Sequence, residues 1–278
     1  MKIIDIWKKY GYNYETNLLI LEILKIKKSD LYIKSYQEIE FSKLNKFDKL
    51  YERLKQDEPI QYIIGKSEFM NNWFFVNSNV LIPRPETEIL TKVSLKIAKH
   101  FKNGFTIFDL GTGSGNIIIS LAKRLKNKDI NFLASDISKK ALKIAYKNSL
   151  YHKVEKKITF LCGNLWKALK NHNQSQKINM IISNPPYISN FDYENLELKV
   201  KNYEPSISLK GRENGLYFLK NIIKNAPNYL AFEGYLILEI GMGQEILLEK
   251  IIKKMNIYSK LKIVKDKAGI NRIIVLQL

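Results

Sequence analysis

Short apolar runs alternate with helical stretches from residue 105 onward, and this alternation constrains the fold of the 278-residue chain most. A strand followed by a helix, repeated several times, builds a parallel sheet covered by helices on both faces. In such α/β sheets, ligands bind beyond the carboxyl ends of the strands. The expected strands are 105–110, 131–135, 158–162, 178–183, 235–240, 261–265 and 272–276, and the expected helices are 116–125, 138–148, 215–229 and 244–254.

The part of the chain before residue 60 has the pattern of a small helical bundle. Apolar residues crowd between residues 13 and 27. They recur every three or four positions between residues 46 and 57, which places them on one face of a helix. Pro59 ends that helix, because proline lacks the backbone N–H that a helix interior needs.

A hairpin is expected between the helical part and the α/β part. Residues 69–82 are rich in aromatic and β-branched side chains, with Asn71-Asn72 as the turn. Two prolines, Pro83 and Pro85, then exclude a helix. The expected organisation is a helical N-terminal domain over residues 1–68, a β-hairpin linker over 69–84 and the α/β domain over 85–278.

Composition excludes several classes of protein. A single cysteine, Cys162, rules out a disulfide framework, and its place at the end of an apolar strand predicts a buried thiol. The histidines His100, His152 and His172 have polar surroundings and no paired spacing, so we expect exposed side chains and no metal. The apolar runs are too short to span a bilayer, and no secretory signal precedes them. We therefore expect a cytoplasmic protein without membrane contact.

The formal net charge of +19 would favour nucleic acid as a partner. However, only five of the 46 basic residues are arginine, the side chain that nucleic-acid-binding proteins use for bidentate contacts. Lysine, asparagine and isoleucine share A/T-rich codons, so codon bias could produce much of this lysine excess, and we treat the charge as weak evidence about partners. We expect a monomer that requires no direct contact with nucleic acid.

A glycine-rich loop follows the first strand of the α/β part and opens a helix. Its residues are Gly111, Thr112, Gly113, Ser114 and Gly115. Glycines allow sharp turns and a close approach of the backbone to a ligand. Asp136 ends the second strand, 21 residues after Gly115, where a carboxylate can bind both hydroxyls of a ribose. Two cofactor classes fit: dinucleotides, whose usual spacing is G-x-G-x-x-G, and S-adenosylmethionine.

The tetrapeptide Asn184-Pro185-Pro186-Tyr187 follows the apolar strand at 178–183. A planar amide or exocyclic amine is a poor nucleophile, so it must be held in line with the group it attacks. The Asn184 side-chain oxygen and the Pro185 carbonyl can each accept one hydrogen of a target NH2 group. Tyr187 can pack on its plane, and the two prolines fix the carbonyl direction. Oriented dipoles of this kind stabilise developing charge without a strong base.

The glycine loop, with Asp109 before it, resembles class I S-adenosylmethionine-dependent methyltransferases, and the tetrapeptide resembles those that act on planar NH2 groups. Flanking segments look like the HemK/PrmC family of peptide chain release factor glutamine methyltransferases. These segments are 58–65 (EPIQYIIG), 68–69, 75–76, 80–88 (VLIPRPETE), 203–205 (YEP), Gly211 and Gly215-Leu216.

The resemblance implies a Rossmann-like, seven-stranded methyltransferase domain preceded by a helical, substrate-recognising domain and a β-hairpin linker. It implies transfer of a methyl group from S-adenosylmethionine to the side-chain amide of the glutamine in the Gly-Gly-Gln motif of class 1 release factors. The implied cofactor residues are Gly111, Thr112, Gly113, Ser114, Gly115, Asp136, Asn164, Leu165 and Asn184. The implied substrate residues are Asn184, Pro185, Pro186 and Tyr187, of which Asn184, Pro185 and Tyr187 would be catalytic.

One segment departs from the family pattern. Asn164 stands where the family usually has an acidic residue, so the side-chain acceptor for the adenine amine is kept but its charge is lost. Either Leu165 or Trp166 can pack on the adenine. Arg84 can pair with Glu86 or Glu88, or meet the substrate.

Two other functions stay open on the sequence. An amino-methyltransferase of rRNA or DNA would use the same tetrapeptide and would suit the charge of +19. A non-catalytic RNA-binding protein rests on the charge alone. Transfer of label from the cofactor to a release factor or to nucleic acid separates these alternatives.

Overall fold

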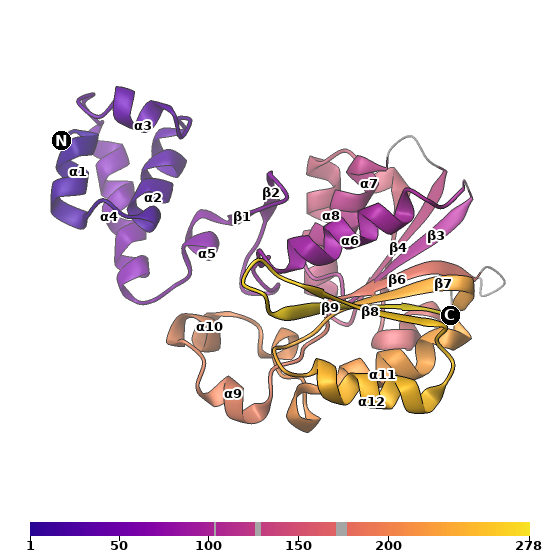
Figure 1. Ribbon diagram of the computed structural model, residues 1–278. Helices are drawn as coiled ribbons and strands as arrows, with labels where there is room; N and C mark the ends of the chain where they lie inside the picture. The colour runs from indigo at the N-terminus through magenta and orange to yellow at the C-terminus, as the bar shows by residue number, and fades with distance from the viewer. Residues whose placement is uncertain (103, 126–128, 171–176) are drawn as a thin grey trace. The chain divides into compact units, whose positions relative to one another are not determined.

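The computed structural model describes residues 1–102, 104–125, 129–170 and 177–278, and by its internal contacts it divides into two compact units (Figure 1). The first unit comprises residues 1–66 and 197–203, and the second comprises 67–196 and 204–278. The helices of the first unit are α1 (Ile3–Tyr10), α2 (Tyr14–Leu24), α3 (Asp30–Ile33), α4 (Phe41–Lys55), α5 (Ile60–Ile64) and α10 (Leu198–Tyr203).

The first unit is a helical bundle, as the apolar periodicity predicts. Its core contains residues from all five leading helices, among them Ile6, Leu19, Leu31, Phe47 and Ile60. Asn13 caps α2 by accepting a hydrogen bond from the backbone of Thr16. Helix α4 begins at Phe41, earlier than expected. Pro59 starts α5 as well as interrupting the chain, because proline is tolerated at a helix N-terminus.

The hairpin differs from its predicted position. Its strands are β1 (Lys66–Phe69) and β2 (Asn72–Phe75), and Met70 and Asn71 form the turn with φ of 53° and 60°. Asparagine tolerates this left-handed conformation, so one asparagine of the predicted pair is in the turn and the other begins β2. Phe69 and Phe74 are buried in the core of the second unit, so the hairpin packs as part of that unit. The division at residues 68 and 84 stays a prediction.

The sheet of the second unit has seven strands in the order β5-β4-β3-β6-β7-β9-β8. Its strands are β3 (Phe105–Leu110), β4 (Ile130–Asp136), β5 (Ile158–Cys162), β6 (Ile178–Ser183), β7 (Leu230–Glu239), β8 (Lys260–Lys265) and β9 (Asn271–Gln277). Every predicted strand exists. The expected parallel sheet is mixed, because β9 returns between β7 and β8 and is antiparallel to both. A short turn joins β8 to β9, and such a connection permits only antiparallel pairing.

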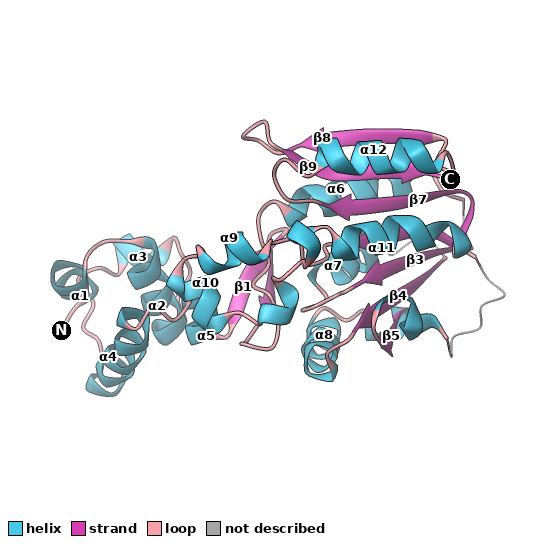
Figure 2. Ribbon diagram, turned by 90° about the horizontal axis from the view of Figure 1, so that it is seen from below, coloured by secondary structure: helices cyan, strands magenta, loops and turns pink. Residues whose placement is uncertain are grey.

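Helices cover both faces of the sheet (Figure 2). The unit contains α6 (Thr87–Ala98), α7 (Asn116–Arg124), α8 (Lys139–Tyr151), α9 (Asn190–Glu194), α11 (Tyr217–Asn225) and α12 (Glu245–Met255). Alternate strand residues face opposite layers: Ile107 packs with α6 and α7, whereas Phe108 packs with α11 and α12. The alternation of helix and strand in the sequence is thus confirmed.

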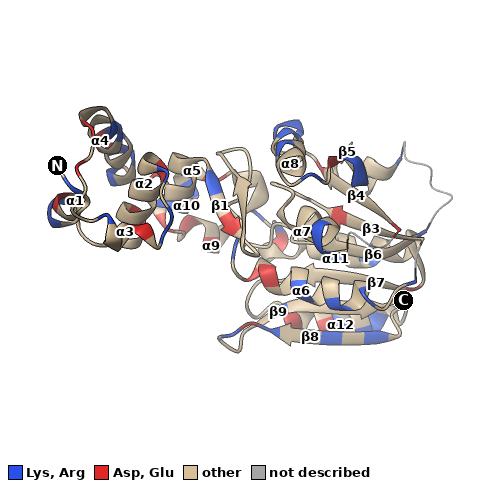
Figure 3. Cartoon of the chain, turned by 90° about the horizontal axis from the view of Figure 1, so that it is seen from above, with Lys and Arg blue, Asp and Glu red and all other residues tan. Residues whose placement is uncertain are grey.

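Lysines line one edge of the sheet, along β8 and the neighbouring α12 (Figure 3). Lys260, Lys262 and Lys265 are exposed on the edge strand β8. Charged side chains on an edge strand oppose pairing with another sheet. These lysines of β8 are thus placed where they can keep the edge of the sheet unpaired. No helix within the described ranges is long and apolar enough to cross a membrane.

Two expectations about single residues are wrong. Cys162 is exposed, because it is the last residue of edge strand β5. His152 is half-buried: its ring lies 4.7 Å from that of Phe74, and its Nε2 is 2.9 Å from the Trp73 carbonyl oxygen. His100 is exposed as expected, and His172 lies outside the described residues.

Candidate functional site

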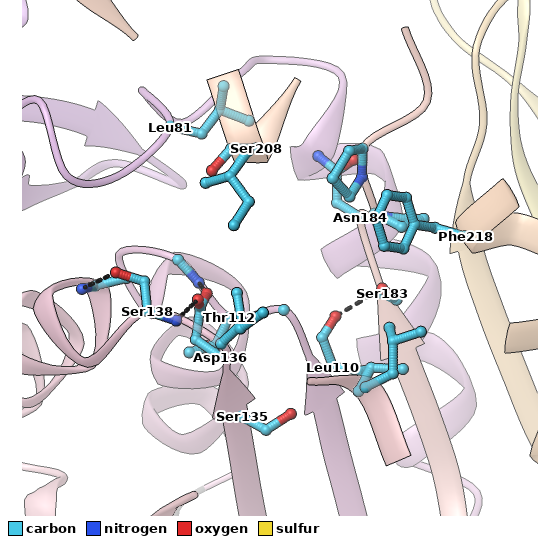
Figure 4. A pocket seen from close by; sticks show the side chains of 18 of the residues that line it. Leu81, Leu110, Thr112, Ser135, Asp136, Ser138, Ser183, Asn184, Ser208 and Phe218 are labelled. Atoms are coloured by element: carbon cyan, nitrogen blue, oxygen red, sulfur yellow. Dashed lines mark hydrogen bonds between the residues drawn. The ribbon is translucent and has the colours of Figure 1, made fainter. Parts of the chain in front are cut away.

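A cavity of about 430 Å³ lies in the second unit at the carboxyl ends of the parallel strands. Its lining includes every residue predicted to bind the cofactor except Gly115, together with Pro185 and Pro186. Figure 4 shows Thr112, Asp136 and Ser138 on one side and Asn184 with Phe218 on the other. These two sides are called the cofactor side and the transfer side below.

The glycine loop forms the cofactor side. The backbone N–H groups of Gly111 and Thr112 donate to the carbonyl of Ser135 at 2.9 and 2.8 Å, which ties the loop to β4. Gly111 and Gly113 have positive φ, and a Cβ built on either meets nothing within 4 Å. Their bare backbone thus borders open space that a ligand can occupy. Gly115 has another use, since its Cβ would lie 2.8 Å from Ile119 Cδ1 at the start of α7.

Asp136 lies beside this loop at the end of β4. Its carboxylate accepts hydrogen bonds from the backbone N–H of Gly113 at 2.9 Å and of Ser138 at 2.8 Å. Burial raises the pKa of the carboxyl, and these backbone donors oppose the rise. An ionised carboxylate has about four acceptor positions, so Asp136 keeps capacity to accept hydrogen bonds from a ligand.

Asp109, the residue before the last of β3, is fully buried beneath the loop. Its Oδ2 accepts from the Thr112 hydroxyl at 2.7 Å, and its Oδ1 has no hydrogen-bond partner within the part of the chain that is described. Burial raises the pKa of this carboxyl to about 7, Thr112 opposes the rise, and the charge of Asp136 adds to it. Asp109 therefore holds the loop through Thr112 rather than lining the cavity.

Asn164, Leu165 and Trp166 extend the cofactor side after β5. The Trp166 ring stacks on Tyr229, with centroids 4.5 Å apart, and its Nε1 donates to Asn221 at 3.2 Å. These contacts fix the indole at the cavity wall. Leu165 lines the same wall in a left-handed conformation, with φ of 48°. The structure places both side chains at this wall, and the packing of either on an adenine stays a prediction.

Asn184 is on the transfer side, directly after β6. Strand β6 is the neighbour of β3, and the Ser183 hydroxyl donates to the Leu110 carbonyl at 2.6 Å. Asn184 therefore lies opposite the glycine loop at the same edge of the sheet, as predicted. Its Nδ2 donates to the Thr87 hydroxyl at 3.0 Å. This bond orients the amide while Asn184 itself lines the cavity.

Tyr187 is not among the described residues that line the cavity. Its hydroxyl donates to Glu239 at 3.0 Å, and burial together with the charge of Glu239 raises its pKa strongly. Its carbonyl accepts from Gln244 Nε2 at 3.0 Å. The structure thus places Tyr187 where it braces the tetrapeptide, and its predicted packing on a substrate stays a prediction.

Two glycines hold the tetrapeptide from behind. A Cβ on Gly215 would lie 2.1 Å from the Tyr187 carbonyl oxygen, and one on Gly211 would lie 2.7 Å from Tyr187 Cα. Only a residue without a side chain permits this approach. Arg212, which lies between these two glycines in the sequence, lines the cavity.

Of the alternatives for Arg84, the ion pair with Glu86 or Glu88 is not formed, and contact with a substrate stays a prediction. The Arg84 guanidinium binds the carboxylate of Glu204, which is 5% exposed and also accepts from the Ile82 backbone N–H at 3.2 Å. The segment after the hairpin is thereby tied to the segment after the tetrapeptide. Both segments border the cavity, through Pro83 and Ser208 among others.

Sequence reasoning missed the polar residues that hold the tetrapeptide, namely Thr87, Glu239 and Gln244. Glu239 had a local signal, because it is an acid that directly follows the apolar run 235–238 of strand β7. Thr87 belongs to the quoted segment at 80–88, but nothing in the spacing indicates that it meets a residue 97 positions away. Such contacts depend on the topology of the sheet.

Comparison with curated proteins gives several relatives over nearly the whole chain. A protein of Thermodesulfovibrio yellowstonii named release factor glutamine methyltransferase is 38% identical, over 99% of this chain and 96% of that protein. One of the same name from Fusobacterium nucleatum is 37% identical, over 99% of this chain and 76% of that protein. A third, from Staphylococcus aureus, is 35% identical over 92% and 89% of the two chains.

Family models match both parts of the chain, and solved methyltransferase structures share the fold of the second part. Residues 101–273 match a methyltransferase domain family, and residues 12–65 match the PrmC N-terminal domain. A methyltransferase from Pyrococcus furiosus shares the fold, with a TM-score of 0.53 at 16% identity over 83% of this chain and 98% of that one. The N-terminal domain of human METTL16, solved in complex with SAH, gives a TM-score of 0.52 at 17% identity over 73% and 74%. The chain belongs to the family of release factor glutamine methyltransferases.

Proposed function

We propose that this protein transfers a methyl group from S-adenosylmethionine to the side-chain amide nitrogen of the glutamine in the Gly-Gly-Gln motif of class 1 release factors. The observation that carries the proposal is the arrangement of Asn184. Its amide is oriented by Thr87, and it faces the cavity that the glycine loop and Asp136 also border. The family membership supports the same activity.

The cofactor side fits S-adenosylmethionine. Asp136 would accept hydrogen bonds from the ribose hydroxyls, and the bare backbone at Gly111 and Gly113 leaves room for the amino-acid end. Asn164 and either Leu165 or Trp166 would border the adenine. When bound there, the cofactor supplies a methyl group attached to a sulfonium sulfur. The neutral thioether that remains after transfer is a good leaving group.

The transfer side explains how a glutamine amide can react. The nitrogen lone pair is delocalised into the carbonyl, so the amide reacts only when it is held in line and its charge is stabilised. The Asn184 Oδ1 and the Pro185 carbonyl would each accept one N–H of the target. Accepting both hydrogens orients the nitrogen toward the cofactor side and favours the positive charge that develops on it.

A transfer assay tests this proposal. Purified protein and labelled S-adenosylmethionine are incubated with release factor that carries either glutamine or alanine in its Gly-Gly-Gln motif. Label in the glutamine form alone is the expected result. Absence of label from both forms would contradict the proposal, and cellular RNA in a parallel tube tests the alternative nucleic-acid substrate.

We further infer a division of labour between the two units. The helical first unit, which matches the PrmC N-terminal domain, would recognise the body of the release factor. The protein would act as a monomer in the cytoplasm and need no nucleic acid. Light scattering on the purified protein checks the first point, and transfer to a nuclease-treated release factor checks the last.

A further inference from the structure

A chain of hydrogen bonds runs behind Asn184 to a buried carboxylate. Glu239, the last residue of β7, is 0% exposed, and Thr87, the first residue of α6, is 2% exposed. The Thr87 hydroxyl lies 2.7 Å from Glu239 Oε2 and 3.0 Å from Asn184 Nδ2. The other carboxylate oxygen, Oε1, lies 3.0 Å from the Tyr187 hydroxyl.

Counting protons along this chain fixes its polarity. An ionised carboxylate only accepts hydrogen bonds, so Thr87 and Tyr187 must both donate to Glu239. A threonine hydroxyl has one hydrogen, so Thr87 can then only accept from Asn184. Asn184 must therefore turn its NH2 group to Thr87. Its Oδ1 is left as the group that can accept from a ligand in the cavity.

The geometry points to Glu239 and Thr87 as positioning residues: the charge of Glu239 dictates, through the single hydroxyl of Thr87, which end of the Asn184 amide faces the substrate. Neither residue lies at the reacting atoms, and both act through Asn184. The functional meaning of the inference rests on the proposed methyl transfer, which needs an acceptor at that position.

A neutral Glu239 would release this constraint. The protonated acid could donate to Thr87, and Thr87 could then donate to the Asn184 Oδ1. The amide would turn over and present an NH2 group to the target NH2 group, so two donors would face each other. The buried charge thus selects the productive orientation, and its loss permits the unproductive one.

Neighbouring groups place this change near neutral pH. Burial, the largest effect, raises the pKa of Glu239 to about 7, and the charge of Glu86 on the α6 side adds to the rise. Hydrogen bonds from Thr87 and Tyr187 and the charge of Arg272 on β9 oppose it. Glu239 is ionised above this pH, so the productive orientation is expected to gain population as the pH rises through about 7.

The first experiment uses neither cofactor nor substrate. The full chain is labelled with 15N-asparagine, and the Asn184 side-chain NH2 signal is assigned by its loss in Asn184→Ala. In the wild type this signal should shift with a midpoint near pH 7, and in Thr87→Val the shift should vanish. Thr87→Ser keeps the hydroxyl and should restore it. A wild-type signal that does not move between pH 6 and 8 would overturn the inference.

Thr91→Val is the matched control, because Thr91 is buried one turn further along α6 and its hydroxyl donates to the Thr87 carbonyl, at 3.1 Å. This variant should titrate as the wild type does. Loss of the titration in Thr91→Val as well would mean that any buried valine disturbs the helix, and would count against the assigned chain of bonds.

Methyl transfer supplies the second measurement. Thr87→Val should lower kcat on the order of 10²-fold with an unchanged KM for the cofactor, since it misplaces a group that acts in the transfer step. Glu239→Gln should lower kcat less than Thr87→Val does, and kcat of this variant should rise less steeply with pH than kcat of the wild type. A normal kcat in Thr87→Val would refute the inference. Failure of the wild type to methylate any release factor, with the Asn184 titration intact, would refute the proposed function alone.

Discussion

The cofactor side and the transfer side of the cavity are built in different ways. The cofactor side is built around one short loop: residues 111–115 present backbone, and Asp136 at the end of the neighbouring strand β4 is bound to that loop directly. The transfer side is assembled from distant segments: Asn184 is bonded to Thr87, Thr87 to Glu239, and the Tyr187 carbonyl to Gln244.

The difference suits two tasks: the cofactor side binds a ligand, and the transfer side orients a side-chain amide. A flexible ligand can be held by a loop whose geometry glycines secure locally. A side-chain amide that must present one particular end needs partners with fixed donors and acceptors, and only packed elements provide them. Each side nevertheless contains one buried acid near a strand end with a pKa of about 7: Asp109 on one and Glu239 on the other.

The largest effect expected from this comparison comes from Asn184→Ala. Removing the acceptor should lower kcat by on the order of 10³-fold while cofactor affinity changes little, since oriented dipoles act in the transition state. Single-turnover transfer to the release factor and calorimetric titration of the cofactor measure the two quantities. A kcat within a few-fold of the wild type would break the assignment of Asn184 to the transfer side.

Asp136→Ala should do the reverse on the cofactor side. The cofactor loses an acceptor for its ribose, and Gly113 and Ser138 lose the group that holds their N–H donors. We expect the Kd for S-adenosylmethionine to rise by about 10-fold to 10²-fold, from the loss of charge-assisted hydrogen bonds. At saturating cofactor kcat should recover. A variant that binds normally but transfers slowly would show that the two sides are not separable.

Gly215→Ala tests how rigidly the transfer side is braced. The added Cβ meets the Tyr187 carbonyl oxygen at 2.1 Å, and the φ of +83° already disfavours a side chain. The free energy of unfolding should fall by about 2–4 kcal/mol, from left-handed strain and overpacking together.

The matched control for that variant is Gly243→Ala, where φ is +80° and the Cβ would meet nothing within 4 Å. It should lose only about 1 kcal/mol, the backbone part of the effect. Urea denaturation of the two variants measures the difference. Equal losses would mean that the close approach to Tyr187 contributes nothing.

Asp109→Asn should have the smallest effect, which is a change in how the free energy of unfolding depends on pH. The folded-state pKa of about 7 exceeds the ordinary value of 3.8. The stabilisation from this group is therefore complete below about pH 4 and is lost as the pH rises through about 7. The free energy of unfolding of the asparagine variant minus that of the wild type gives the effect of the substitution at each pH. This difference should be on the order of 1 kcal/mol larger at pH 8 than at pH 5. Parallel unfolding curves at both pH values would contradict this.

Sequence patterns predicted the elements of the α/β part closely, because each depends on a local periodicity. Strands 105–110, 158–162 and 178–183 have the predicted bounds. The hairpin was displaced because one asparagine pair admits more than one turn position. The antiparallel place of β9 was missed because strand order depends on pairing between segments far apart in the chain.

The site follows the same rule. The residues at 111–115, Asp136 and Asn184 could be predicted because each directly follows or ends a strand, and the ends of β3, β4 and β6 meet at one edge. The partners of Asn184 and Arg84 could not, since Thr87, Glu239 and Glu204 are distant in sequence and are selected by packing. Their roles in the reaction stay predictions.

The position of β9 between β7 and β8 also bears on the order of assembly during synthesis. β7 and β8 are both synthesised before β9, the strand that lies between them. β9 pairs with β7, with Ile273 opposite Glu239. Until β9 leaves the ribosome, the growing chain keeps an open edge on β7, to which another chain could pair. A chaperone that shields the β7 edge would therefore matter most for this protein in the interval before β9 is free to pair.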